Sequence, residues 1–449
     1  MIIPRASGRL CSRAVCSALR RKDSSMRIMV IGGGGREHAL AWKISQSKLT
    51  EQLYCAPGNP GTGALGENLP IAPEDTDAVV AAAKQNKVDL VVVGPEDPLA
   101  AGMVDAVRAA GIMCFGPVAA GARLEADKAF AKDLMRSASI PTAEAHIFKD
   151  FSAAREYALS RDHGIVVKAA GLAKGKGVFV CPEPHMAIRP LEQMMQQRVF
   201  GGAGDKVIIE EMLVGQEASI LALVDGRSIY TLEASQDHKP IGDGDTGPNT
   251  GGMGAYSPTP VVDQATMATV EREILVPIVD AMRRSFGRYE GCLYAGIMLT
   301  HAGPKVLEFN CRFGDPETQP LIMRLSSDLV EAMVATCRHR LDAVTLAWDP
   351  RPAVCVVMAS GGYPGSYEKG HPITGIDAAE ALGDVKVFQA GTALADGKLV
   401  TAGGRVLGVT ALGETIAAAQ KRAYEAVDKI AWEGCYCRRD IADKAIDKA

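Results

Sequence analysis

The stretch Val306–Pro316 constrains the fold of this chain more than any other, because its apolar and polar residues alternate strictly. Successive side chains of a strand point to opposite faces, so the pattern predicts a strand that is buried on one side and polar on the other. The polar face carries a carboxylate, an amide and a guanidinium at alternate positions, namely Glu308, Asn310 and Arg312. Turn residues end the strand at Gly314-Asp315-Pro316.

These three polar side chains suit a site for phosphate and a hard cation. The oxygens of Glu308 and Asn310 are ligands that Mg²⁺ accepts together with phosphate oxygens. The guanidinium of Arg312 matches the geometry of a phosphate. The alternative, for this pattern alone, is an ordinary half-exposed strand with a solvated polar face, and other parts of the sequence have to decide between the two.

Length and composition indicate a multidomain globular protein. The 449 residues exceed one ordinary domain, and 47% hydrophobic with 23% charged residues is an ordinary mixture. The net charge of −4 argues against a nucleic-acid-binding protein, which usually has a basic surface. No apolar run approaches the ~18 residues that a membrane helix requires. The 11 cysteines follow no repeating pattern, which favours reduced, buried thiols.

Residues 1–25 differ in composition from the rest of the chain. They contain six basic residues and one acidic residue, a charge of +5 that leaves −9 for the remainder. This composition resembles an organellar transit peptide; alternatively, Met26 is the true start of the protein. Pro4 and Gly8 interrupt any amphipathic helix, so we expect a disordered extension that catalysis does not need. We expect a cytoplasmic protein, or an organellar one if the segment is a transit peptide.

A strand, a glycine turn and a helix follow directly from Met26. Arg27–Ile31 reads as a buried strand, Gly32–Gly35 as a tight turn and Arg36–Trp42 as the start of a helix. Backbone N–H groups of such a turn bind anions. A dinucleotide fold also needs an acidic residue about 20 residues further on, but the next strand, Gln52–Ala56, runs into Pro57-Gly58-Asn59. The sequence therefore disfavours a nicotinamide-dependent oxidoreductase.

Two more expected strands, Val88–Val93 and Ile112–Phe115, end in Gly-Pro loops. Loops at the carboxyl ends of parallel strands are where such sheets bind ligands. We therefore predict an open parallel α/β domain over residues 26–127.

The next part of the chain contains a glycine-rich hairpin. Gly164–Ala170 and Val178–Cys181 read as strands, and Gly171–Gly177 joins them with two lysines. It lacks the P-loop pattern, but its amides and lysines suit a flexible hairpin that closes over a polyphosphate. A mobile surface hairpin is the alternative.

Further candidate contacts follow the apolar strand Val207–Val214. Backbone exposed after such a strand can pair with an adenine edge, and Glu217 can accept hydrogen bonds from ribose hydroxyls. Ser235–Tyr256 is nearly devoid of core residues, and we expect a long irregular loop, which inside a compact domain is usually functional. An amphipathic helix near residues 264–286 and a strand over Leu293–Thr300 follow. The pattern then restarts with the strands Ala353–Ser360 and 403–410 and a helix near 413–430, which predicts a small α+β cap.

In order and spacing, these motifs resemble the ATP-grasp superfamily and, more narrowly, the phosphoribosylamine–glycine ligase family. The resemblance runs from Met26 to the neighbourhood of Ile441, and its motifs are Gly33–Leu40, Gly58–Gly61, Gly242–Gly254 and Glu308–Glu317. It implies a multidomain α/β and α+β protein. Its parts are an N-terminal parallel α/β domain (26–127), an ATP-grasp domain (128–345) with a lid subdomain at about 148–213, and a C-terminal α+β domain (346–449).

The resemblance also implies a reaction and its participants. ATP, glycine and 5-phosphoribosylamine would give glycinamide ribonucleotide, ADP and phosphate through a glycyl phosphate intermediate, the second step of purine synthesis. The implied cofactors are ATP and Mg²⁺ or Mn²⁺. The expected protein is a monomer with small-molecule substrates and no nucleic-acid or membrane partner.

Site residues follow from matching the family motifs. The metal ligands would be Glu308 and Asn310, and the catalytic cations Arg312 and Lys168. The ATP contacts would be Lys128, Lys168, Gly175, Lys176, Gly177, Glu210, Glu211, Leu213 and Glu217. The contacts to the other substrates would be Gly35, Arg36, Glu37, Asn59, Glu96, Asp237, His238, Asp243, Asp245, Thr246, Asn249 and Thr250.

Two positions depart from the family pattern. Ala170 replaces an aspartate in the hairpin strand, and Gln389 replaces a histidine of a His-Ala-Gly-Thr motif. Both concern substrate contacts rather than the reaction class. The rival hypotheses are another ATP-grasp ligase of the biotin carboxylase or carboxyaminoimidazole ribonucleotide synthase type, and a catalytically inactive nucleotide-binding module. The Gly242–Gly254 loop argues against the first, and the intact Glu308, Asn310, Arg312 and Lys168 argue against the second.

Overall fold

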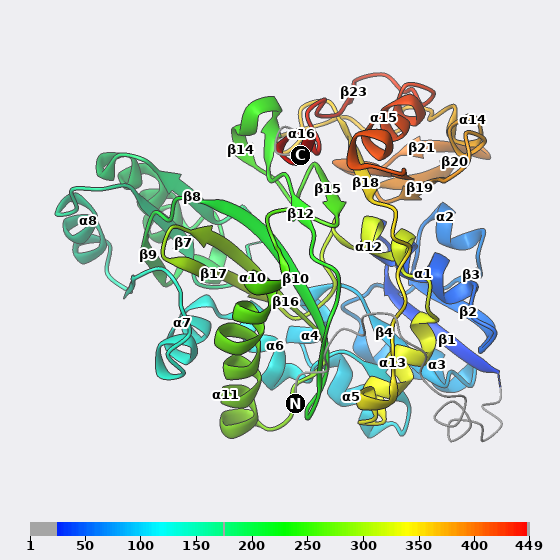
Figure 1. Cartoon of the computed structure of the whole chain (residues 1–449), viewed down its shortest axis with the longest axis horizontal. Helices are drawn as coiled ribbons and strands as arrows, with labels where there is room; N and C mark the ends of the chain where they lie inside the picture. The colour runs from blue at the N-terminus through cyan, green and yellow to red at the C-terminus, as the bar shows by residue number, and fades with distance from the viewer. Residues whose placement is uncertain (1–24, 174–175, 447–449) are drawn as a thin grey trace.

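The computed structural model describes residues 25–173 and 176–446. The expectations for residues 1–24 and for Gly175 therefore lie outside the described residues. Within the described part, a lobe built around α8 (Phe151–Leu159) lies to one side of a larger body, as Figure 1 shows. No helix there is both long and apolar enough to cross a membrane. The described cysteines are free thiols, and most of them are buried.

The N-terminal part is the predicted open parallel sheet, with strand order β3-β2-β1-β4-β5. Its central strands β1 and β4 are apolar apart from Arg27 and almost entirely buried, which is the usual state of a parallel sheet. The strands are β1 (Met26–Gly32), β2 (Thr50–Pro57), β3 (Glu67–Asn68), β4 (Leu90–Val93) and β5 (Met113–Phe115). The helices are α1 (Gly35–Ser45), α2 (Pro60–Gly63), α3 (Thr76–Gln85), α4 (Glu96–Ala100), α5 (Met103–Ala109) and α6 (Ala119–Ala126).

Two antiparallel sheets form the middle of the chain. The central sheet has the order β11-β10-β16-β17 and the lobe sheet the order β6-β9-β7-β8. The central strands are β10 (Gln216–Asp225), β11 (Ile229–Thr231), β16 (Glu290–Thr300) and β17 (Gly303–Asn310). The lobe strands are β6 (Ala145–Phe148), β7 (Ile165–Ala169), β8 (Val178–Cys181) and β9 (Val207–Glu211). The helices α10 (Gln264–Val270) and α11 (Val276–Phe286) lie within the helix predicted near residues 264–286 and carry its apolar stripe, and α7 (Lys128–Ser137) packs against the same core.

The C-terminal sheet draws strands from two distant parts of the chain. Its order is β12-β15-β18-β22-β19, with β23 beside β18. The early strands are β12 (Gln236–Asp237) and β15 (Gly254–Ser257). The late strands are β18 (Ala353–Ser360), β19 (Val385–Gln389), β22 (Arg405–Leu412) and β23 (Cys435–Tyr436), with the helices α14 (Ile376–Glu380), α15 (Ile416–Val427) and α16 (Asp443–Ile446).

The prediction of a long irregular loop at Ser235–Tyr256 is therefore wrong. The segment forms β12, the hairpin of β13 (Pro240–Gly242) with β14 (Thr246–Asn249), and β15. Met253 and Tyr256 are fully buried in the core of the C-terminal sheet. Two such core residues were too weak a signal in a segment rich in glycine, so the pairing of β15 with β18 escaped sequence reasoning. The domain boundaries at 127/128 and 345/346 and the lid range stay predictions.

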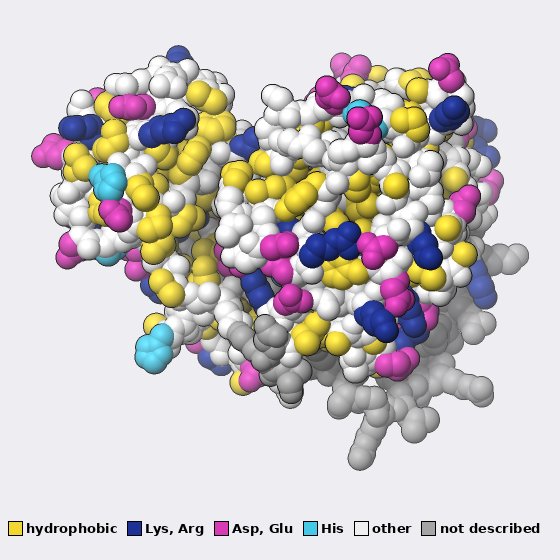
Figure 2. Space-filling view, turned by 90° about the horizontal axis from the view of Figure 1, so that it is seen from above, with side chains coloured by type: hydrophobic (Ala, Val, Ile, Leu, Met, Phe, Trp, Pro, Cys, Tyr) yellow, Lys and Arg dark blue, Asp and Glu magenta, His cyan; other side chains and the backbone are white. Residues whose placement is uncertain are grey.

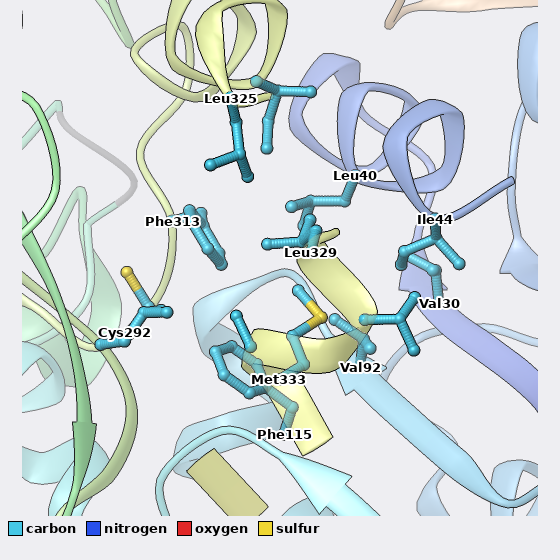
Figure 3. Close-up of a cluster of buried hydrophobic side chains, with 14 of the residues drawn as sticks. Val30, Leu40, Ile44, Val92, Phe115, Cys292, Phe313, Leu325, Leu329 and Met333 are labelled. Carbon is cyan, nitrogen blue, oxygen red and sulfur yellow. The ribbon is translucent and has the colours of Figure 1, made fainter. Parts of the chain in front are cut away.

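A shared apolar core joins the N-terminal sheet to the central part (Figure 3). Side chains from β1 and α1, such as Val30 and Leu40, meet side chains from α12 (Thr318–Arg324) and α13 (Leu329–Cys337). Phe313 inserts into this core and stacks on Phe115 with ring centroids 6.1 Å apart. The buried residues on one side of the Val306–Pro316 stretch thus fix its polar side relative to the N-terminal sheet.

The strand that carries the polar triplet is shorter than predicted. β17 ends at Asn310 rather than at Phe313. The backbone N–H of Cys311 donates to Glu125 Oε2 at 2.7 Å, so it leaves the ladder with β16. Arg312 still returns to the same side, because its Nη2 donates to Asn310 Oδ1 at 3.2 Å.

Candidate active site

A cavity of about 720 Å³ lies where the N-terminal sheet, the lobe, the central sheet and the C-terminal sheet meet. The space-filling view in Figure 2 shows the lobe at the left and the body at the right, separated by a groove. The cavity brings together fifteen of the residues predicted from sequence: Arg36, Glu96, Lys128, Lys168, Gly177, Glu210, Glu211, Leu213, Glu217, Asp237, Asn249, Thr250, Glu308, Asn310 and Arg312. Segments more than 200 residues apart in the sequence thus share one site.

The lobe side of the cavity combines an apolar wall with buried cations. Lys168 Nζ lies 2.8 Å from Glu210 Oε2 and donates to the Leu307 carbonyl at 3.1 Å. Lys132 Nζ lies 3.1 Å from the other oxygen of Glu210. Burial lowers the pKa of Lys132 to about 8, although Glu210 opposes that change. The wall itself is made of Val166, Leu172, Val180, Met212, Leu213, Met298 and Leu307.

The polar face of β17 looks into the same cavity. Glu308 forms no ion pair within 4 Å among the described residues. Burial opposes its ionisation, but the charges of Lys239, Lys168 and Lys128 hold the pKa of Glu308 below its ordinary value. A carboxylate kept charged without a direct partner, two residues from an amide oxygen, fits a divalent cation. No group of three or more His, Cys, Asp or Glu side chains in the described residues could hold a metal. The remaining ligands of a cation bound at Glu308 and Asn310 would therefore come from phosphate or water.

Arg312 is held by protein groups on every side. Its Nε lies 3.3 Å from Glu96 and its Nη2 lies 2.9 Å from Glu125. Its Nη1 donates to the Phe313 carbonyl at 3.2 Å, and Arg36 donates to the same carbonyl at 3.1 Å. The sequence prediction that Arg312 serves as a fixed fork for a phosphate did not include this network, because partners contributed by α4 and α6 are not visible in a strand pattern. In this arrangement Arg312 orients Asn310.

Lys239 occupies the opposite corner of the cavity. Its Nζ lies 2.8 Å from Glu217 and 3.1 Å from Asp237. These two carboxylates, with Glu308, raise the pKa of Lys239 against the effect of burial. Glu217 therefore already has a cationic partner at the place where a ribose contact was predicted.

A second cavity of about 1120 Å³ shares part of this lining and opens beside the β13–β14 hairpin. Lys176 and Asp245 line it rather than the first cavity. Lys176 Nζ donates to the Pro364 carbonyl at 3.5 Å, so the glycine hairpin reaches the C-terminal part. Asp245 is paired with Arg438 at 3.1 Å and with Lys444 at 2.5 Å.

The remaining predicted residues line neither cavity. Glu37 accepts from the Gly34 N–H at 2.8 Å and stabilises the glycine turn. Asn59 Nδ2 donates to the carbonyls of Gly33 and Gln389 at 2.9 and 2.8 Å, which ties the N-terminal sheet to β19. Asp243 accepts from the backbone of the C-terminal tail and Thr246 is exposed, while Gly35 is buried at the start of α1. These positions belong to the frame around the site.

His238 also lies outside both cavities. It is 1% exposed, and burial, then the charges of Lys444 and Arg438, lower its pKa to about 3. Its ring is therefore neutral at ordinary pH. Among the residues that depart from the family pattern, Ala170 is buried and its carbonyl accepts from the Lys128 N–H at 2.8 Å. The Gln389 side chain accepts from Thr392 at 3.0 Å, away from the cavity.

Family models match all three parts of the chain in order. The N domain of phosphoribosylglycinamide synthetase matches residues 26–125, its ATP-grasp (A) domain residues 126–318, and its C domain residues 353–444. The chain belongs to the phosphoribosylglycinamide synthetase family. Its central domain is thus an ATP-grasp domain, a class that binds ATP and a divalent cation.

Relatives named phosphoribosylamine–glycine ligase match the chain over nearly their full length. The protein of Rhodopirellula baltica is 54% identical over 436 residues, covering 95% of this chain and 100% of the relative. That of Escherichia coli K12 is 51% identical over 429 residues, covering 94% and 99%. The crystal structure of the Thermotoga maritima protein of this name has a TM-score of 0.82 at 34% identity, covering 93% and 100%.

Other solved structures share only the fold with this phosphoribosylglycinamide synthetase family member. The Thermotoga maritima N5-carboxyaminoimidazole ribonucleotide synthetase has a TM-score of 0.61 at 16% identity. The Campylobacter jejuni biotin carboxylase has a TM-score of 0.69 at 14% identity. These are the two rival ligase classes that the Gly242–Gly254 motif argued against.

Sequence reasoning missed several cavity residues that this family member brings to the site. They are Lys132, Lys239, Tyr294, Asp315, Glu317 and Arg405. Arg405 comes from β22 and donates to the carbonyls of Gly251 and Asp315 at 2.7 and 2.8 Å. Gly252 has φ +110°, and a Cβ there would collide with Pro316. The Gly242–Gly254 and Glu308–Glu317 motifs can therefore touch only with glycine at this position. Asp315 and Glu317 belong to the Glu308–Glu317 motif, and their negative charge was the sequence signal that could have identified them as site residues.

Proposed function

We propose that this chain joins glycine to 5-phosphoribosylamine with ATP, giving glycinamide ribonucleotide, ADP and phosphate. Two findings support this proposal: family models match all three domains, and relatives named phosphoribosylamine–glycine ligase are 54% and 51% identical in sequence over nearly their full length. The observation that carries it is the cavity, in which buried lysines of the lobe face the polar side of β17. That arrangement suits a reaction whose reactants carry many phosphate charges.

For ATP, we assign the base to the apolar wall of the cavity, beside the backbone at Leu213. Lys128 and Lys168 would face the phosphates, since both lie near Glu308 and both act on its charge. Gly177 and the neighbouring hairpin would cover the phosphates from the lobe side. Glu210 holds Lys168 and Lys132 in place, which makes it a positioning residue for the cations rather than a direct ATP contact.

For the metal, we assign Glu308 and Asn310 as the protein ligands of Mg²⁺, with Mn²⁺ as the other candidate. When bound, the cation neutralises charge on the phosphates during transfer. Arg312 keeps the Asn310 oxygen oriented, and Glu96 and Glu125 keep Arg312 in place. The three lysines near Glu308 keep this carboxylate ionised when no cation is present.

The proposed chemistry has two steps. The carboxylate of glycine attacks the γ-phosphorus of ATP, and the bond to the bridging oxygen of ADP breaks, giving glycyl phosphate. The amine of phosphoribosylamine then attacks the carbonyl carbon and phosphate leaves, with loss of a proton from the amine. The protein positions the reactants, offsets their charge and excludes water, which would hydrolyse glycyl phosphate. The lobe hairpin is the part suited to exclude water.

We place the sugar phosphate at the N-terminal side of the cavity, near Arg36, with Asn249 and Thr250 on the facing wall. We further propose a monomer that works in the cytoplasm, or in an organelle if residues 1–25 are a transit peptide. A reporter fused to residues 1–25 in a eukaryotic cell distinguishes the two locations.

A coupled ADP-release assay tests the proposed reaction. ADP should appear at a sustained rate only when glycine and phosphoribosylamine are both present, and glycinamide ribonucleotide should form in equal amount. Equal turnover with bicarbonate in place of glycine would contradict the proposal and point to a carboxylating ATP-grasp enzyme.

A further inference from the structure

The cavity contains four buried carboxylates, and three of them are neutralised by a protein cation. The three pairs are Glu125–Arg312 at 2.9 Å, Glu210–Lys168 at 2.8 Å and Asp237–Lys239 at 3.1 Å. Glu317 is the fourth, and it is 4% exposed. Among the described residues, no Lys, Arg or His nitrogen lies within 4 Å of its carboxylate. Buried carboxylates are normally paired, so this exception calls for a cation from outside the chain.

One oxygen of Glu317 is fixed and the other is available. Oε1 accepts from the Tyr294 hydroxyl at 3.0 Å and from the Ser219 hydroxyl at 3.4 Å. These two hydroxyls lie 2.9 Å from each other, which holds the carboxylate in one orientation. No other residue in the part of the chain that the structure describes donates to Oε2, although the backbone N–H of Glu317 itself donates to the carboxylate, and Glu317 lines the cavity. A ligand in the cavity can therefore use Oε2 without displacing a protein group.

The position of Glu317 relative to β17 restricts what that ligand is. Tyr294, which anchors Glu317, pairs directly with Asn310 in the β16–β17 ladder. Side chains of directly opposed residues lie on the same face of a sheet, so Glu317 sits beside the proposed site of phosphoryl transfer. The glycine carboxylate reacts there, and its ammonium nitrogen is only two covalent bonds from the carboxyl carbon. The ammonium group must therefore fall close to this face.

We propose that Glu317 holds the ammonium group of glycine and determines the specificity for this substrate. The inference rests on the proposed function and extends it to a residue not assigned to any ligand. A carboxylic acid without the amine would leave Glu317 buried and unpaired, and such a penalty is how polar sites reject analogues that lack a hydrogen-bonding group.

The charges around Glu317 support this assignment. Burial, and then the charge of Asp237, raise the pKa of Glu317 to about 7, while Lys239 and the Tyr294 hydroxyl act in the opposite sense. Arg312 and Arg405 also face it from their own segments. Asp237 has the direct partner Lys239 and Glu317 has no such partner among the described residues, so of the two carboxyl groups Glu317 takes up a proton more readily. An ammonium group favours the ionised carboxylate, and glycine binding near neutral pH should therefore release a proton.

Calorimetry on the full chain tests this proton release. Glycine is titrated into protein loaded with Mg²⁺ and a non-hydrolysable ATP analogue, in two buffers of different ionisation enthalpy. The wild type should release a proton on binding. Glu317→Gln should lose about 100-fold in glycine affinity and release none, since removing the charge of one partner of a buried ion pair leaves the other partner's charge uncompensated. Glu290→Gln is the matched control, because Glu290 is a buried glutamate of β16 paired with Arg108 outside the cavity.

Titration of the wild-type protein with acetate tests the same proposal without a substitution, because acetate is glycine without the ammonium group. Acetate should bind weakly to the wild type and without proton release. Unchanged glycine affinity in Glu317→Gln, or proton release with acetate, would overturn the proposal. Proton release with phosphoribosylamine instead of glycine would also overturn it, because the cation would then be the other amine. Wild-type protein that binds glycine with proton release but forms no glycinamide ribonucleotide would contradict the proposed function alone.

Discussion

Glu96 allows the strength of the Arg312 network to be measured from the pH dependence of stability. Burial opposes ionisation of Glu96, but the charges of Arg312 and Arg36 and a hydrogen bond from its own backbone N–H hold the pKa of Glu96 down from 4.5 to about 2. A gap of that size corresponds to about 3 kcal/mol of unfolding free energy, at 1.36 kcal/mol for each factor of ten in proton affinity. The side chain is 21% exposed, so solvent screening brings the expected value to about 2–3 kcal/mol.

The perturbation is Glu96→Gln, which keeps the shape and removes the charge. Arg312 retains Glu125 at 2.9 Å and Arg36 retains Glu37 at 2.6 Å, so the substitution leaves neither arginine without a partner. Since the folded-state pKa is lowered, the stabilisation is fully present above about pH 4.5 and is lost as the pH falls toward about 2. The difference between wild type and variant should shrink over the same interval.

The assay is urea unfolding of both proteins at a series of pH values, followed by circular dichroism and by tryptophan fluorescence. Trp42 packs against the core that joins the N-terminal sheet to the central part, so it reports on the region that contains Glu96. Glu67→Gln serves as the control, because Glu67 is exposed and forms no ion pair within the described residues. A difference below about 0.5 kcal/mol, or one that does not change with pH, would refute the reasoning.

Four other predictions follow from the site and its surroundings. Glu308→Gln should lose most activity and bind the ATP analogue less tightly with Mg²⁺ than the wild type does, but equally without the metal; wild-type turnover at ordinary Mg²⁺ would exclude Glu308 as a ligand. Arg405→Met should raise KM and lower turnover by about 10-fold or more with secondary structure retained, because Gly251 and Asp315 lose their shared donor; Arg405→Lys should recover part of this. Cleavage by protease within residues 171–177 should fall when saturating Mg·ATP is added, and unchanged cleavage would count against a closing hairpin. Deletion of residues 2–25 should leave turnover and the thermal midpoint unchanged, since β1 begins at Met26, and a loss of either would show that the segment is part of the working enzyme.

The parts of the fold that were predictable from sequence are those with local signals. The parallel sheet at Met26 follows from a buried strand, a glycine turn and a helix start that lie next to one another in the sequence. The lobe hairpin follows from two apolar strands that flank glycines and lysines, and β7 and β8 do pair. In both cases each residue is interpreted against neighbours only a few positions away, so no knowledge of distant contacts is needed.

The parts that were not predictable depend on partners far along the chain. Arg312 was interpreted from sequence as a phosphate ligand, and its network was missed because its partners Glu96 and Glu125 precede it by about 200 residues. Asn59 lies in a polar loop motif that is typical of a substrate contact, but its side chain donates to the backbone carbonyl of Gln389, more than 300 residues away. A polar residue in a loop motif is equally suited to a ligand or to a distant carbonyl, and only the folded chain distinguishes the two.

The two early strands in the C-terminal sheet also limit how members of this family can be cut and recombined. A fragment starting near residue 346 would present β18 without β15, an unpaired apolar edge that invites aggregation. A chimera joined at that point would combine β15 from one parent with β18 from the other, so its sheet would depend on both parents having matching side chains. The same crossing means that the C-terminal sheet cannot swing away alone, because it would pull β12 and β15, and with them Asn249 and Thr250, out of the cavity. Exchange experiments should therefore move residues 235–257 together with residues 346–449 as one unit.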